Sequence, residues 1–265
     1  MTELRNQINN IVEDYNACKV LAKSIENPSV YEGTTATAED IREGKTAYSN
    51  GERIIGTMTA SNNNVLIDIN ATTSTVFTAI GNTTKINLTN VDLSRFASIA
   101  NAFASYSALE EIINLKTTKV TNFSSAFNNC NNLKTITNFD TSKGTNFNST
   151  FRNCTSLEET PLIDMSKVTN CANMFSGCTK LKTINLTFDE YLSSSFYTIS
   201  DLVKNCPNLT DESLNIIMLL ASKSSVTGST NKTLYYLGIS QDQATRCQSL
   251  SNYQAFINAG WTTGY

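Results

Sequence analysis

Apolar positions in the middle of the chain recur every 24 residues. Successive units read KVTNFSSAFNNCNNLKTI, KGTNFNSTFRNCTSLEET and KVTNCANMFSGCTKLKTI, with a degenerate unit before them and a fifth, shifted by four residues, after them. A unit of this length cannot bury an apolar core alone and must stack on its neighbours. The aligned columns are Phe103, Phe127, Phe151, Phe175 and Val203; Tyr106, Cys130, Cys154, Cys178 and Cys206; and Leu109, Leu133, Leu157, Leu181 and Leu209.

Within each unit the spacing predicts one short helix followed by one short strand. Phe123, Phe127 and Cys130 stand at i, i+4 and i+7, which would place them on one face of a helix of about two and a half turns. Two polar residues then predict a turn, and the alternation from Leu133 to Ile136 is typical of a strand. Stacked units would pair these strands about 4.8 Å apart.

The cysteine and asparagine columns favour structural roles. Metal ligands must converge on one point, whereas cysteines at this spacing would form a ladder, so we interpret them as packing residues. We interpret the asparagines as a ladder and as helix N-caps between units, the alternative being a row of polar groups that binds a ligand. The asparagine column is Asn122, Asn146 and Asn170, preceded by Thr121, Thr145 and Thr169.

The units resemble the BspA-type leucine-rich repeats, whose consensus runs roughly V-T-N-M-x-x-M-F-x-x-C-x-x-L-x-x-L-D-L-S. The likeness is clearest at Val168-Thr169-Asn170, Met174-Phe175, Gly177-Cys178 and Leu181, and it extends over residues 88–210. It implies an α/β repeat fold, a leucine-rich-repeat solenoid. It also implies the settings in which that family occurs, bacterial surface adhesins and the tail and fibre proteins of bacteriophages.

Two departures from the pattern fall in the third unit. Thr160-Pro161 interrupts the isoleucine column, and Gly144 replaces the counterpart of Val168. Proline cannot donate to a strand ladder and glycine weakens a strand, so we expect this unit to be kinked or loosened.

Residues 1–27 predict an amphipathic helix with coiled-coil spacing. Apolar residues follow one another at gaps of four and three over three heptads, and Pro28 ends the helix. Isoleucine at both core positions favours three or more strands, so we expect a homo-oligomer, with a trimer favoured. The alternative is an ordinary amphipathic helix that packs on its own chain. The residues expected to mediate oligomerisation or attachment are Leu4, Ile8, Ile11, Tyr15, Cys18, Ala22 and Ile25.

Residues 28–60 predict a small helix-hairpin attachment module. A helix is expected from Thr37 to Gly44, and Asn50-Gly51 predicts a two-residue hairpin turn between Thr46–Ser49 and Glu52–Thr57. This string resembles a short module, D-I-x-x-G-K-T-A-Y-x-N-G-x-x-I-x-G-T-M, of phage tail and fibre proteins. The resemblance implies a virion protein.

Both ends of the repeat stack are expected to be covered. Residues 61–87 combine a linker with a β-prone segment and predict a β-rich N-terminal cap. Residues 211–265 predict a helical C-terminal cap in which Trp261 is an anchor, the alternative being an exposed residue that stacks on sugar. The three helices of this cap are expected to begin near Thr210, Ser240 and Ser251.

Composition excludes most catalytic chemistry. The chain has no histidine, which removes Ser-His-Asp and Cys-His catalysis and histidine-ligated metal. Charged residues make up 16% and the net charge is −3, so neither nucleic acid nor an anionic membrane is a favoured partner. No apolar stretch has the length of a secretion signal or of a membrane span. We expect no catalytic residue, cofactor or metal.

These patterns together favour a non-enzymatic bacteriophage structural protein of the tail, baseplate or fibre, assembled in the host cytoplasm and located in the virion. We expect its N-terminus to attach to other virion proteins and its repeats to present a surface to a host-cell glycan or protein. The alternatives are a bacterial surface adhesin of the BspA-like family and an architectural decoration protein without a receptor. The strand residues expected to face outward are Glu111, Ile113, Thr135, Thr137, Glu159, Thr183 and Asn185.

Overall fold

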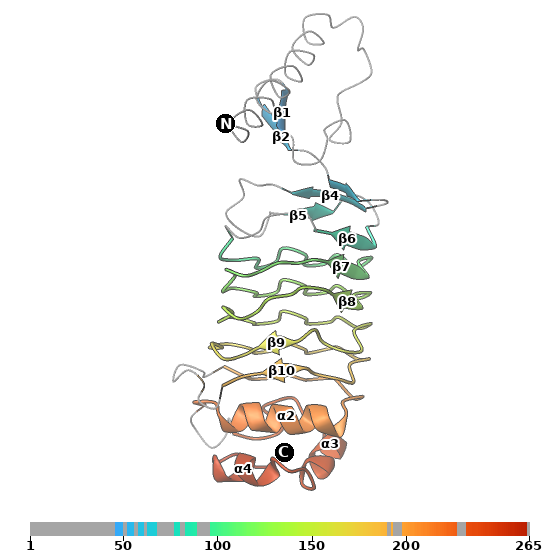
Figure 1. Cartoon of the computed structure of the whole chain (residues 1–265). Helices are drawn as coiled ribbons and strands as arrows, with labels where there is room; N and C mark the ends of the chain where they lie inside the picture. The colour runs from blue at the N-terminus through green and yellow to red at the C-terminus, as the bar shows by residue number, and fades with distance from the viewer. Residues whose placement is uncertain are drawn as a thin grey trace, which may run out of the picture.

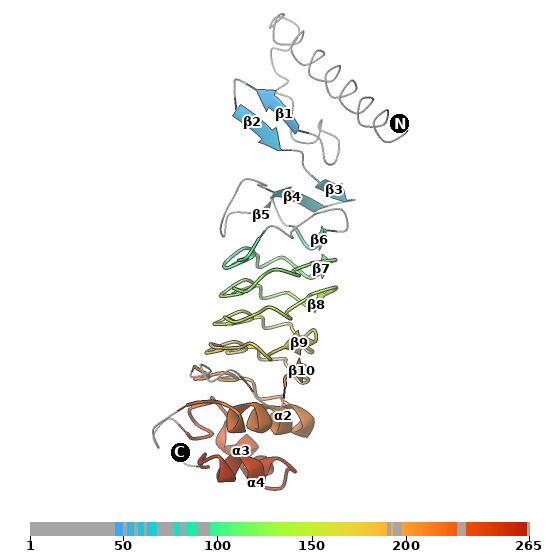
Figure 2. The same ribbon diagram turned by 60° about the vertical axis from the view of Figure 1, so that its left-hand side comes forward.

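The protein is described by a computed structural model in which coils of the chain stack into a column (Figure 1). A small antiparallel sheet lies at one end of the coils and helices lie at the other (Figure 2). The structure describes residues 46–49, 52–55, 58–60, 63–67, 77–79, 83–88, 96–189, 192, 198–226 and 232–263. The helices predicted over residues 1–27 and from Thr37 to Gly44 lie outside the described residues.

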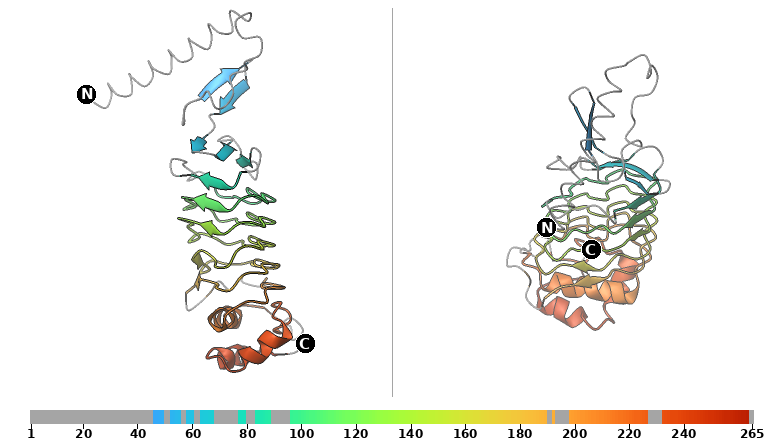
Figure 3. Two further views of the ribbon diagram at one scale, coloured as in Figure 1. Left: turned by 90° about the vertical axis from the view of Figure 1, so that its right-hand side faces the viewer. Right: turned by 45° about the horizontal axis from the view of Figure 1, so that its top comes forward.

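One side of the coils carries short parallel strands, each paired with a strand of a neighbouring coil. The strands are β6 (Lys85–Asn87), β7 (Glu111–Ile113), β8 (Thr135–Ile136), β9 (Ile163–Asp164) and β10 (Leu186–Thr187). They form two sheets, β6-β7-β8 and β9-β10. The strands run along one edge of the column and the segments between them along the opposite edge (Figure 3, left).

Antiparallel strands precede the coils. Strands β1 (Thr46–Ser49) and β2 (Glu52–Ile55) pair with Ser49 opposite Glu52, so a two-residue hairpin lies where Asn50-Gly51 predicts it. Strand β4 lies in the middle of a second sheet and contacts β6, which joins this sheet to the first coil. That sheet consists of β3 (Met58–Ala60), β4 (Asn63–Ile67) and β5 (Phe77–Ala79).

The helix predicted in each unit is wrong: the segment forms a series of tight turns. The N–H of Ala126 donates to the carbonyl of Phe123 (3.0 Å), three residues earlier, whereas the N–H of Phe123 donates to the carbonyl of Asn146 (2.8 Å) in the next coil. Alternate amides therefore close turns and connect coils, which an α-helix does not allow. We call these segments turn ribbons: residues 99–106, 123–130, 147–154, 171–178 and 199–206.

Left-handed residues explain why the ribbons are not helices. Two residues in each ribbon, four apart, have positive φ between 52° and 80°. An α-helix needs negative φ throughout, whereas glycine, then asparagine and aspartate, enter the left-handed region at least cost. Serine occupies the remaining left-handed positions. The positions are Asn101 and Ser105, Ser125 and Asn129, Ser149 and Asn153, Asn173 and Gly177, and Asp201 and Asn205.

Phenylalanine rings stack through the core behind the ribbons, as the repeat predicts. The ring centroids of Phe103 and Phe127 are 5.4 Å apart, those of Phe127 and Phe151 5.2 Å, and those of Phe151 and Phe175 5.9 Å. All four side chains are fully buried. Burial of this much aromatic surface is the main contribution that we identify to the stability of the stack.

Three helices cover the far end of the column: α2 (Asp211–Ser222), α3 (Gln241–Cys247) and α4 (Tyr253–Asn258). The hydroxyl of Thr210 caps α2, and Ser240 with Gln243 forms a capping box on α3, as predicted. Trp261 is only 1% exposed and packs on Phe256 with ring centroids 5.3 Å apart. Trp261 is therefore an anchor of the cap, and the alternative of an exposed sugar-stacking residue is wrong.

Candidate functional site

One row of side chains on the strand side of the coils faces solvent. Glu111, Ile113 and Thr135 of this row lie in β7 and β8, whereas its other four residues lie outside the strands. Ile112, Ile136 and Ile184 point into the core, so their neighbours in the chain point outward. We call the outward set the outer strand face. Its members are Thr135, Thr137 and Glu159, which are exposed, and Glu111, Ile113, Thr183 and Asn185, which are half-buried.

Charges at the outer strand face are paired from one coil to the next. A hydrogen bond from Lys182 and its positive charge lower the pKa of the Glu158 carboxyl below its ordinary value. Exposed pairs of this kind contribute little to stability. The carboxylate of Glu159 instead accepts a hydrogen bond from the side-chain amide of Asn185 (2.9 Å). The pairs are Lys85 with Glu111 (2.6 Å), Lys134 with Glu110 (2.6 Å) and Lys182 with Glu158 (2.8 Å).

The sheet on this side is interrupted in the third unit, as Pro161 predicts. The N–H of Thr137 donates to the carbonyl of Ile112 (2.9 Å), but one coil further on the corresponding residue is Pro161, which has no N–H. The adjacent Leu162 is 62% exposed. The loosening expected at Gly144 is wrong, because this residue is buried against Phe147, whose ring leaves no room for a side chain.

The cysteines form a ladder that belongs to the core. Each thiol donates to the carbonyl of a phenylalanine one coil earlier, which confirms their role in packing. Burial raises the pKa of Cys130 and of Cys206 to about 12, so both stay protonated near neutral pH. The bonds are Cys130 to Phe103 (2.9 Å), Cys154 to Phe127 (3.2 Å), Cys178 to Phe151 (3.0 Å) and Cys206 to Phe175 (3.0 Å).

The asparagine column forms a ladder through its backbone, with Asn122 paired to Asn146 and Asn146 to Asn170. Its side chains do not join the coils, and the predicted helix N-caps are wrong. The side-chain oxygens of Asn122, Asn146 and Asn170 accept from the amide two residues on, at 3.0 to 3.1 Å, and so close turns within their own coil. The threonine column does join the coils: each hydroxyl donates to a carbonyl 24 residues earlier. The acceptor oxygens of one row and the hydroxyls of the other are thus engaged in holding the fold.

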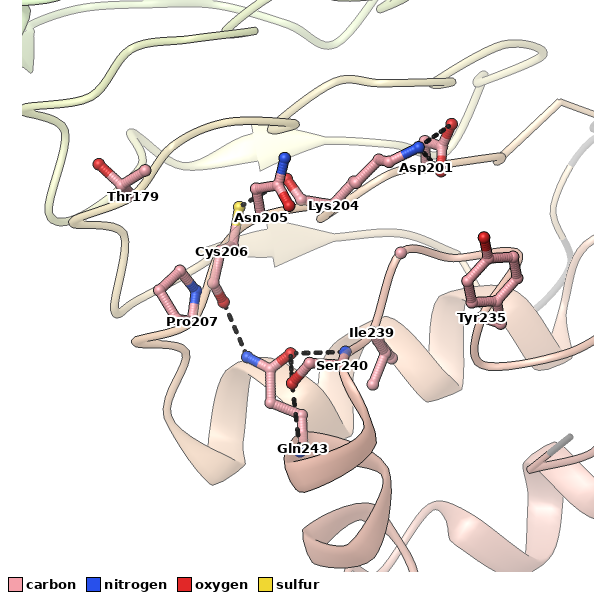
Figure 4. Close-up of a pocket in the computed structure, with 11 residues that line it drawn as sticks. Thr179, Asp201, Lys204, Asn205, Cys206, Pro207, Tyr235, Ile239, Ser240 and Gln243 are labelled. Carbon is pink, nitrogen blue, oxygen red and sulfur yellow. Dashed lines mark hydrogen bonds and ion pairs between the residues drawn. The ribbon is translucent and has the colours of Figure 1, made fainter. Parts of the chain in front are cut away.

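A cleft that the sequence did not predict lies between the fifth turn ribbon and the C-terminal cap (Figure 4). Residues 232–239 lie against the ribbon like a further coil: the N–H of Asp201 donates to Tyr236 (2.7 Å) and that of Val203 to Leu237 (3.0 Å). The space beyond these bonds measures about 460 Å³. Its lining residues include Thr179, Asp201, Lys204, Asn205, Pro207, Tyr235, Ile239 and Gln243.

The cleft opens where the pattern of bonds between coils stops. In the four earlier ribbons the last left-handed residue donates its N–H to the next coil, as Asn153 does to Ser176 (2.8 Å). The corresponding N–H of Asn205 has no partner among the described residues. Gly238 lies so close to the backbone of Lys204 that a side chain at this position would not fit. Beyond Gly238 the chain turns away from the ribbon and enters α3. This divergence leaves the space beside Asn205.

Neither a metal centre nor a membrane span emerges from the described part of the chain. Its cysteine and carboxylate side chains form no group of three or more that could hold a metal ion. None of its helices combines the length and apolar character needed to cross a bilayer. The heptad residues from Leu4 to Ile25, predicted to mediate oligomerisation, lie outside the described residues.

Comparisons with known proteins give one family and one structure. Residues 71–211, just over half of the chain, match the family described as "Mycoplasma protein of unknown function, DUF285". No curated protein matches the chain significantly. A leucine-rich repeat protein of T. pallidum (TpLRR) is similar at 15% sequence identity and a TM-score of 0.30, over 65% of this chain and 100% of that chain.

Proposed function

We propose a function for this chain from the premise that it belongs to the DUF285 family, whose description leaves the function open. It is a non-enzymatic recognition protein, a BspA-like leucine-rich-repeat solenoid that presents the outer strand face to a glycan or protein of a cell surface. The 24-residue period and the bonds that repeat from coil to coil support this type of solenoid.

The exposed threonine row of the outer strand face is the observation that carries the proposal. Thr135 and Thr137 both stand exposed, on either side of the buried Ile136. The hydroxyl of Thr137 accepts a hydrogen bond from the N–H of Asn114 in the preceding coil (3.0 Å) and keeps its own proton for a ligand. A largely polar face that extends over successive coils suits many weak contacts better than one tight contact.

Residues 1–60 attach and oligomerise the protein in this proposal. The heptad pattern favours a trimer, and three copies would multiply the avidity of a weak surface. Residues 35–58, which resemble a module of phage tail and fibre proteins, support attachment to a virion. The proposed setting is therefore a phage tail, baseplate or fibre.

A bacterial surface adhesin is the second candidate. The family description names Mycoplasma, which favours a cellular protein over a viral one. Both candidates use the same recognition surface; it is displayed on a phage particle in the first and on a bacterial cell in the second. An architectural protein without a receptor is the third possibility, and it predicts that the outer strand face binds nothing.

Binding of the purified full chain to bacterial cells, measured by flow cytometry over a panel that includes mycoplasmas, tests the recognition surface. We expect the double variant Thr135→Arg, Thr137→Arg to lose at least tenfold in binding, because two bulky charges cover the row. Thr118→Arg is the matched control, since Thr118 is exposed but outside the row, and it should bind as the parent does. Equal binding by all three proteins, or binding by none, would contradict the proposal.

Immunogold electron microscopy separates the two settings. Label on the tails of particles would support the virion, and label on the cell envelope would support the adhesin. Native mass spectrometry of the full chain then tests the trimer, with Ile8→Asp, Ile11→Asp as the variant expected to yield monomers. A monomeric parent protein would overturn the oligomer.

A further inference from the structure

The two walls of the cleft differ in chemistry. The fifth turn ribbon supplies Asp201, Lys204 and Asn205, and the cap supplies Tyr235 and Ile239 (Figure 4). Cys206 and Gln243 close the floor, where the side-chain amide of Gln243 donates to the carbonyl of Cys206 (2.7 Å). This bond ties α3 to the ribbon, so the two walls are held at a fixed separation.

The charges in the cleft cancel. An oxygen of Asp201 lies 3.4 Å from the ammonium of Lys204, and both side chains are substantially exposed, at 37% and 52%. A loose pair of this kind does not select an anion or a cation, but its carboxylate oxygens and ammonium hydrogens remain able to bond to hydroxyl groups.

An unpaired backbone amide adds a further donor. In the fifth turn ribbon the N–H groups of Asp201 and Val203 point to the cap. Asn205 follows at the same two-residue interval, so its N–H points the same way, into the space that the cap leaves. The side chain of Asn205 is exposed beside it and offers a donor and an acceptor together.

Tyr235 supplies an aromatic ring from the cap, on the wall opposite these polar groups (Figure 4). Its side chain is 66% exposed and, with Leu162, it is one of two large apolar side chains so exposed in the described part of the chain. Tyrosine presents both an apolar ring and a hydroxyl, a combination that suits a ligand with one apolar and one polar face.

From this combination we propose that the cleft is a binding site for a neutral saccharide. The ring of Tyr235 stacks on the C–H face of a pyranose, while Asp201, Asn205 and the free amide bond to neighbouring hydroxyl groups. The volume of about 460 Å³ lies within the range of small-ligand sites, roughly 300 to 1,000 Å³. The site shares no residue with the outer strand face and does not depend on its function.

Saturation-transfer NMR and calorimetry on the full chain test the site, with glucose, galactose and N-acetylglucosamine as probes. We expect millimolar binding of at least one sugar, with transfer strongest at its ring C–H protons. Tyr235→Ala should weaken that binding at least tenfold, and Tyr235→Phe, which keeps the ring, less than threefold. Asp201→Asn should weaken it at least tenfold while still tolerating the left-handed backbone at φ 52°.

Thr137→Arg on the outer strand face is the control and should leave sugar binding unchanged. Loss in this variant, with binding retained in Tyr235→Ala, would move the sugar to the outer strand face and overturn the cleft site. Failure of the parent protein to bind any of the three sugars at 20 mM, or equal binding in Tyr235→Ala, would also overturn it. Unchanged thermal unfolding of each variant confirms that the exposed substitutions leave the fold intact.

Discussion

The turn ribbons and the strands are opposite sides of the same coils, but they hold the coils together to different degrees. The bonds between ribbons continue without a break from Ile99 to Lys204, through each successive coil. The strands form two separate sheets that are interrupted beside Pro161. The ribbon side therefore maintains the stacking register, and the strand side tolerates variation.

The reason lies in what each side buries. Behind the ribbons lie the stacked phenylalanines and the cysteine thiols, all without exposure to water. The strands contribute two or three residues per coil, and half of their side chains face solvent. A hydrogen bond lost on the side that carries most of the core leaves buried groups without a partner, which is destabilising. At a half-exposed edge water can replace the lost partner.

Alkaline pH should produce the largest difference between the two sides. Burial raises the pKa of Cys130 and Cys206 to about 12, and that of Cys154 and Cys178 well above the ordinary value. As pH rises, the thiols of the unfolded chain therefore lose their protons before those of the folded chain. The free energy of unfolding keeps its full value below about pH 8.5 and falls as pH rises towards the pKa values of the folded state.

The expected loss is about 1.4 kcal/mol per pH unit for each thiol, seen as a falling free energy of unfolding in urea between pH 9 and 11. The variant Cys154→Ala, Cys178→Ala should reduce the slope by the share of two thiols. An identical slope in the two proteins would show that other groups cause the loss.

Removing one ring from the stack should give the next largest effect. Phe151→Ala should lower the free energy of unfolding by about 3 to 5 kcal/mol, because the ring packs between Phe127 and Phe175 and leaves a cavity. Leu162→Ala on the strand side should change it by less than about 0.5 kcal/mol, since that side chain is exposed. Urea unfolding of both variants measures the contrast, and similar losses would contradict it.

A β-branched residue at a left-handed position should have an intermediate effect. Ser125 has φ 55°, so Ser125→Val should cost about 1 to 3 kcal/mol through backbone strain. Ser125→Gly removes the same hydroxyl without the strain and should stay within about 1 kcal/mol of the parent. Thermal unfolding of the pair isolates the backbone term. Equal destabilisation by valine and glycine would assign the loss to the hydroxyl instead.

Repairing the strand side should have the smallest effect. Pro161→Thr restores an N–H opposite the carbonyl of Ile136, and the net gain of about 1 kcal/mol from one hydrogen bond is offset by a more flexible unfolded chain. We expect a change of less than about 1 kcal/mol in unfolding free energy, with slow hydrogen exchange at the new amide. Stabilisation by several kcal/mol would show that the interruption is a defect of the whole stack.

Features that depend on local chemistry or on the period itself could be predicted from the sequence. Asn50-Gly51 fits one turn type, Thr210 and Ser240 are helix caps, and a strict period aligns the phenylalanines whatever the backbone between them does. The interruption at Pro161 follows because proline has no backbone N–H to donate. The outward strand residues follow from alternation alone.

Apolar residues at i, i+4 and i+7 fit both a helix and a turn ribbon, so this spacing alone predicts the wrong element. The signal that separates them is the pair of small polar residues four apart, such as Ser125 and Asn129, which a helix has no reason to repeat in every unit. The cleft could not be predicted, because residues 232–239 do not keep the period. It exists only where the cap diverges from the last ribbon beyond Gly238.

Every backbone hydrogen bond between turn ribbons runs in one sense, from the N–H of one coil to the carbonyl of the next. Each complete unit therefore has the same donor side and the same acceptor side as its neighbours. A duplicated 24-residue unit could be inserted between two units and would form the same hydrogen bonds to both. Each insertion would extend the reach of the molecule by about 4.8 Å while leaving both ends as they are. Duplication of such units can in this way change the distance between the N-terminal strands and the C-terminal cap in uniform steps.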